Sequence, residues 1–60
     1  MNLKPFKVFD YLSKETHTYT INENGEWFST KTGGIISEDV AISAYRYCSS
    51  FHDHYSVEFL

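Results

Sequence analysis

The sequence predicts a small α+β domain: an antiparallel sheet in the order β-β-β-α-β, with one helix packed on one face. Three observations support this prediction. Aromatic and β-branched residues concentrate in short runs, an Asn-Gly pair separates two of these runs, and one stretch opens with helix-capping residues. A chain of 60 residues has room for one such domain, so residues 1–60 are taken as a single unit.

The first two strands are predicted from composition and alternation. Residues 6–12 are rich in aromatic and β-branched side chains without helical periodicity, which is typical of a strand. Residues 13–16 would reverse the chain. Residues 17–21 alternate, so Tyr19 and Ile21 are expected on one face of the second strand.

The turn that follows contains the Asn-Gly pair, which is a strong hairpin signal. A two-residue turn would place Glu23 directly opposite Glu26, and like charges across a ladder are unfavourable. A three-residue loop with Gly25 in the left-handed conformation avoids this and places Ile21 opposite Trp27. We therefore expect the longer loop.

A third strand is predicted over residues 26–30, followed by Gly33-Gly34 as a strand breaker and by Ile35-Ile36 as a short apolar step. The helix is expected to begin at Ser37, whose hydroxyl would cap the free amides. Glu38 and Asp39 lie favourably near the positive end of the helix dipole. The helix stripe expected to face the sheet consists of Val40, Ala44, Tyr47 or Cys48, and Phe51.

Residues 55–60 alternate and predict the last strand. Tyr55, Val57 and Phe59 are expected to point inward, with Ser56 and Glu58 outward. This strand would enter the sheet either at an edge or between earlier strands.

Composition narrows the environment and the partners. The single cysteine excludes an internal disulfide, and no apolar run matches a signal peptide or a membrane span, so we expect a cytoplasmic protein without membrane contact. The net charge is −3 and the basic residues are scattered, which disfavours direct nucleic-acid binding. A protein partner with a basic surface fits this charge better.

Two candidate chemical sites share residues near the end of the expected helix. Cys48, His52 and His54 could supply a sulfur and two imidazoles to a zinc ion, but a closed site needs a fourth ligand, and a buried cysteine beside a solvated turn explains the same residues. Cys48 and His52 also lie one helical turn apart, as a nucleophile and its base would. Nothing in the sequence supplies an oxyanion hole or an orienting group, so neither an enzyme nor a cofactor is expected.

The aromatic content exceeds what one small core needs: five Phe, five Tyr and one Trp. Some of these rings are expected on the surface, where Tyr, Trp and Arg often dominate binding energy. The candidate partner-binding residues are Tyr45, Arg46, Phe28 and Trp27. The alternative is that every ring belongs to the core.

These observations predict a small acidic, non-enzymatic protein-binding module. It would inhibit or modulate a larger protein, one that handles nucleic acid for example, as bacteriophage or plasmid takeover proteins and antitoxins do. The alternative function is a small metal-binding protein that uses Cys48, His52 and His54. Self-association into a homodimer through spare aromatics or an open sheet edge is compatible with the first function.

Overall fold

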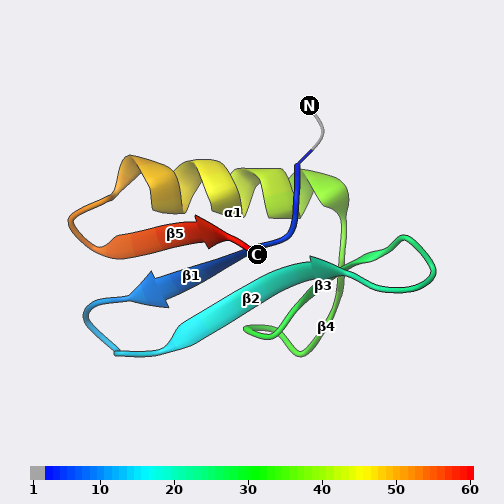
Figure 1. Ribbon diagram of the computed structural model, residues 1–60, viewed down its shortest axis with the longest axis horizontal. Helices are drawn as coiled ribbons and strands as arrows, with labels where there is room; N and C mark the ends of the chain where they lie inside the picture. Colours follow the sequence, from blue (N-terminus) through cyan, green and yellow to red (C-terminus); the bar gives the residue numbers. More distant parts are fainter. Residues whose placement is uncertain (1–2) are drawn as a thin grey trace.

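The computed structural model describes residues 3–60. Five strands and one helix follow one another along the chain (Figure 1). Their bounds are β1 Phe6–Asp10, β2 Thr16–Ile21, β3 Trp27–Ser29, β4 Gly34–Ile36, α1 Glu38–Ser50 and β5 Tyr55–Phe59.

All five strands form one antiparallel sheet in the order β4-β3-β2-β1-β5. The first four strands are neighbours both in sequence and in space, and α1 then carries the chain back across to the free side of β1, where β5 adds at the edge (Figure 1). The predicted α+β fold is confirmed. Of the two positions that the sequence left open for the last strand, at an edge or between earlier strands, β5 occupies the edge.

The strand β4 was not expected. The breaker prediction was wrong for Gly34, which pairs with Ser29 as the first residue of β4. Of these two neighbouring glycines, only Gly33 has the left-handed backbone that a turn requires, with φ of 75°. Ile35 then pairs with Phe28, so the short apolar step is the edge of the sheet opposite β5.

The hairpin between β2 and β3 has the predicted register. Ile21 lies opposite Trp27, and Gly25 is left-handed with φ of 80°. The Asn22 side chain shapes the loop, because its Oδ1 accepts the backbone N–H groups of Asn24 and Glu26, each at 2.9 Å. This is the local bonding that makes Asn favourable in turns.

The core lies between the sheet and the helix. Its buried apolar residues are Leu3, Phe6, Val8, Tyr19, Trp27, Ala41 and Cys48. Phe6 is its centre, with no exposed surface, and its ring stacks on Tyr19 and meets the edge of Tyr45 at 5.4 Å. The three best-buried rings come from three adjacent strands, so their packing connects β1, β2 and β3 on the helix side of the sheet.

The helix begins as predicted but presents a different stripe. Ser37 Oγ accepts the N–H of Val40 at 3.2 Å, which confirms the cap. The predicted inward stripe was wrong for Val40 and Phe51, because both side chains are exposed, and of the alternatives Tyr47 and Cys48 it is Cys48 that is buried. The buried stripe runs through Ala41 and Cys48, with Ala44 and Tyr45 partly buried between them.

The small side chain of Ala41 explains why this stripe of the helix, and not the predicted one, faces the sheet. With Ala41 completely buried against the sheet, the helix backbone lies close to the strands, and a bulkier residue at that position would hold it away. Within residues 3–60, no helix has the length and the apolar character needed to cross a membrane.

Candidate interaction surface

Among residues 3–60, no element covers one face of the sheet. Phe6 and Val8 point toward the helix, so their neighbours Lys7 and Phe9 point to the other side. Cross-strand partners extend this side across the sheet in three rows of residues. We call the surface that they form the open face. The rows are Glu58-Lys7-Thr18, Ser56-Phe9-Thr16 and Thr20-Phe28-Ile35.

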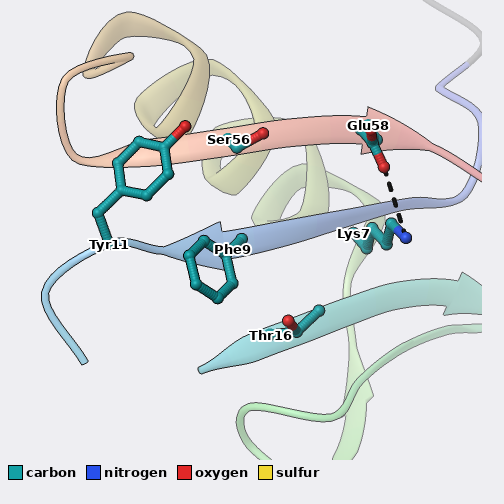
Figure 2. A pocket seen from close by; sticks show the side chains of 6 residues that line it. All are labelled: Lys7, Phe9, Tyr11, Thr16, Ser56 and Glu58. Atoms are coloured by element: carbon teal, nitrogen blue, oxygen red, sulfur yellow. Dashed lines mark ion pairs between the residues drawn. The ribbon is translucent and has the colours of Figure 1, made fainter. Parts of the chain in front are cut away.

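A shallow groove of about 290 Å³ lies at one end of the open face (Figure 2). Lys7, Phe9, Tyr11, Thr16, Ser56 and Glu58 line it. The rings of Phe9 and Tyr11 meet edge to face with centroids 5.6 Å apart. Two rings thus form an apolar wall at a sheet surface that water reaches.

The charges of this groove are paired with each other. Lys7 Nζ lies 3.4 Å from Glu58 Oε2, across the β1–β5 ladder. Both side chains remain largely exposed, so the pair adds little to stability. Its effect on the surface is to leave the groove electrically neutral.

The other end of the open face is apolar. Ile35 is 56% exposed on the edge strand β4 and lies beside Phe28. Thr18 and Thr30 fix the backbone next to it: the Thr18 N–H donates to Thr30 Oγ1 at 2.8 Å, and the Thr30 N–H donates to the Thr18 carbonyl at 3.0 Å. The Thr30 backbone bond therefore extends the pairing of β2 and β3 one residue beyond Ser29.

A second hollow, of about 320 Å³, lies between the helix and the inner side of β1 and β2. Its walls are mostly apolar, and Asp10, His17 and Lys31 also line it. The Cys48 thiol lines it as well, and burial is the main cause that raises the pKa of this thiol. A raised pKa keeps the sulfur protonated, which is the opposite of what a nucleophile or a metal ligand requires.

Two other groups beside this hollow have shifted pKa values. Backbone N–H groups of Leu12 and Ser13 bond to Asp10 Oδ1 at 2.9 and 3.3 Å and hold the pKa of that carboxyl below its ordinary value. Partial burial raises the pKa of Tyr55 above its ordinary value. Both shifts follow from local structure and neither produces an activated acid or base near neutral pH.

The structure distributes the predicted partner-binding residues over different places. Trp27 is only 4% exposed and belongs to the core, so its ring offers almost no surface to a partner. Phe28 lies on the open face. Tyr45 is partly buried between Phe6 and Phe59, while Arg46 is exposed on the helix. The four residues therefore do not form one patch.

The predicted metal ligands also lie apart. Cys48 is buried, His52 is exposed beside Asp53, and the His54 ring lies near Phe51 and Tyr55. Within residues 3–60, no three His, Cys, Asp or Glu side chains gather as metal ligands would.

Sequence reasoning missed Phe9, Tyr11 and Ile35 as surface residues. Alternation along the first strand could have identified Phe9, because side chains of a strand alternate between the two faces, and Phe6 and Val8 lie on the face opposite to Phe9.

Comparisons of the chain with protein-family models, with curated proteins and with solved structures found no match.

Proposed function

We propose that this chain is a non-enzymatic protein-binding module that inhibits or modulates a larger protein, and that the open face is its binding surface. The observation that carries this proposal is the set of aromatic and branched apolar side chains on the uncovered side of the sheet, above all Phe9, Tyr11, Phe28 and Ile35. Exposed apolar groups rimmed by polar ones are typical of protein interaction sites.

The chemistry of the open face favours a protein over a nucleic acid. Of the residues in its three rows, Lys7 alone is a cation, and that ammonium is already paired with Glu58. Phosphate binding needs unpaired, clustered cations. Threonine side chains in the neighbouring rows supply hydroxyls for hydrogen bonds at the border of the apolar groups.

The charge of the chain favours a partner with a basic surface. Three carboxylates lie in the two turns that flank β2, at Glu15, Glu23 and Glu26, and all three residues are exposed. Together with the net charge of −3 they would attract a basic protein toward the sheet. A nucleic-acid-handling protein has such a surface, and a bacteriophage or plasmid protein that blocks it would act in this way.

Variants of exposed residues provide the test. Ile35→Lys and Tyr11→Lys each place a charge on the open face, and Tyr47→Lys places the same charge on an exposed position of the helix. Immobilised wild-type chain would be used to capture a partner from host extract, and the captured protein would then be titrated against all three variants.

The open-face variants should weaken binding at least about tenfold, because each removes apolar contact area and introduces a buried charge into the interface. The helix variant should bind as the wild type does. Far-UV circular dichroism confirms that each variant is folded. Loss of binding by the helix variant alone, or the absence of any specific partner, would contradict the proposal.

A further inference from the structure

We infer that the outer edge of β5 pairs with the same edge of a second copy of this chain, antiparallel about a twofold axis at Val57. The pairing would join two five-stranded sheets into one continuous sheet. This inference goes beyond the proposed function, because it depends on the outer backbone edge of β5 and not on the side chains of the open face.

The backbone of β5 presents unused hydrogen-bonding groups at this edge. The His54 carbonyl accepts the Tyr11 N–H at 3.0 Å, and the Leu60 N–H donates to the Pro5 carbonyl at 3.0 Å, so the backbone groups of even-numbered residues point toward β1. The odd-numbered residues of β5 therefore point away from the sheet. Among the described residues, β5 has no strand neighbour on that side.

Three outward residues supply the donors and acceptors. No bond within residues 3–60 uses the N–H or the carbonyl of Val57, so both are available to a second strand. The Tyr55 N–H already donates to the Phe51 carbonyl at 3.0 Å, which leaves the Tyr55 carbonyl, and Phe59 contributes its N–H. Each copy would donate from Val57 and Phe59 and accept at Val57 and Tyr55.

Burial decreases sharply from β1 to β5 on the helix side of the sheet. Phe6 and Val8 are buried, whereas their cross-strand partners are not: Val57 is half-buried and Phe59 is 54% exposed. The helix packs on β5, and Tyr45 stacks on Phe59 with ring centroids 5.6 Å apart, yet part of the apolar surface at this edge stays exposed and is available to another surface. Leu60, directly after the strand, is also exposed.

The sequence of β5 is complementary to itself. Read in either direction, it runs aromatic, polar, Val, polar, aromatic. In the proposed register Val57 lies opposite Val57 of the second copy, and Tyr55 lies opposite Phe59. Cross-strand aromatic pairs of this kind are favourable.

The charges of β5 select this register. Glu58 lies opposite Ser56 of the second copy, so no like charges face each other. A register shifted by two residues toward Leu60 would place Glu58 opposite its own copy, which is unfavourable. A shift by one residue would oppose outward backbone groups with inward ones and break the ladder.

The opposite edge of the sheet is less suited to pairing. β4 has three residues against five in β5, and one of them is Gly34. A strand this short is one of the ways in which proteins protect an exposed edge. β5 is longer, with five residues, and its helix side carries the apolar and aromatic side chains of Tyr55, Val57 and Phe59.

Sedimentation equilibrium of the purified chain over a concentration series tests the pairing. The mass should rise from that of one chain to that of two. Val57→Pro removes an N–H that points away from β1 and so leaves the intramolecular ladder intact, whereas Val57→Thr keeps the N–H and the β-branched shape.

Val57→Pro should raise the dimer Kd about tenfold or more, since the symmetric bonds at Val57 are lost in both copies. Val57→Thr should stay close to the wild type. A wild-type chain that remains monomeric at the highest concentration would overturn the inference, as would equal dimerisation of the two variants.

Oxidative cross-linking provides a second measurement, which does not depend on the folding of the proline variant. Hydrogen-bonded cross-strand pairs have Cα atoms about 5.5 Å apart, within the range of a disulfide. Val57→Cys should therefore form a covalent dimer, while Ile35→Cys on the opposite edge should not. The reverse result would assign the contact to β4 and refute the pairing through β5.

Both measurements use the purified chain without a partner protein. They therefore succeed or fail independently of whether a larger protein binds the open face.

Discussion

Tyr19 stacks on Phe6, with ring centroids 4.8 Å apart and an angle of 7° between the ring planes. The two residues are direct cross-strand partners of β2 and β1, and both rings are buried beneath the helix. Since Phe6 also contacts Trp27 and Tyr45, it joins three strands and the helix through one side chain.

Phe6→Ala should therefore be the most damaging single truncation in the core. It removes the transfer free energy of a fully buried ring and leaves a cavity, at a cost of about 3–5 kcal/mol. A domain this small has little more than that in total stability, so the variant should be largely unfolded at room temperature. Urea denaturation followed by circular dichroism measures the difference. Leu12→Ala, at a position that is 89% exposed, should change the free energy of unfolding by less than about 0.5 kcal/mol.

Two glycines form a matched pair for backbone conformation. Gly25 has φ of 80° and Gly34 does not have a positive φ, yet a Cβ at either position would meet nothing within 4 Å. Gly25→Ala should cost about 1–2 kcal/mol because the left-handed conformation strains an L-residue. Gly34→Ala should be neutral or stabilising by up to about 1 kcal/mol, since it reduces the freedom of the unfolded chain. Equal effects in thermal melts would show that conformation at Gly25 is not the cause.

The Asp10 carboxylate should make stability depend on acid pH. Hydrogen bonds from Leu12 and Ser13 lower its pKa in the folded state below the ordinary 3.8. The stability that the ionised Asp10 carboxylate contributes is therefore fully present above pH 3.8 and is lost as the pH falls through the folded-state pKa. Asp10→Asn should reduce the acid-dependent fall in the urea midpoint, whereas Asp53→Asn, at a highly exposed turn position, should leave it unchanged.

The Cys48 thiol should react slowly in the folded chain. Burial raises its pKa and also restricts access to the sulfur. A chromogenic disulfide reagent at mildly alkaline pH should modify Cys48 at least about tenfold more slowly in buffer than in denaturant, because both the thiolate fraction and the access increase on unfolding. Equal rates in the two conditions would mean that the thiol is open to solvent, and the ligand hypothesis for Cys48, His52 and His54 would then regain support.

Local chemistry made most of the fold predictable. The repulsion between Glu23 and Glu26 selected the loop, and the structure has the resulting register of Ile21 opposite Trp27. The cap at Ser37 followed from the side chain that precedes the acidic first turn. In both cases the decisive interaction lies within a few residues of the position it determines, so one sequence contains the whole argument.

Features that depend on tertiary packing were not predictable in the same way. The helix has apolar side chains on more than one side, and only its contact with the sheet selects Ala41 and Cys48 over Val40 and Tyr47. The burial of Trp27 likewise depends on tertiary packing, because its ring lies beside Phe6 in the core. A strand of three residues, as in β4, is too short for alternation to distinguish it from a loop.

The β1–β5 ladder has a consequence for how the chain folds. Phe6 pairs with Phe59, whereas each of the other ladders joins consecutive strands. Hairpins of the first four strands close short loops, but the β5 ladder must wait for the helix to bring distant segments together, and long loop closure slows folding. The meander of β1–β4 should therefore form early, with its edge strand β1 unpaired on one side until β5 arrives. During that interval a β5 strand from another chain could occupy the same place, so exchange of strands between molecules is the characteristic error to which this topology is exposed.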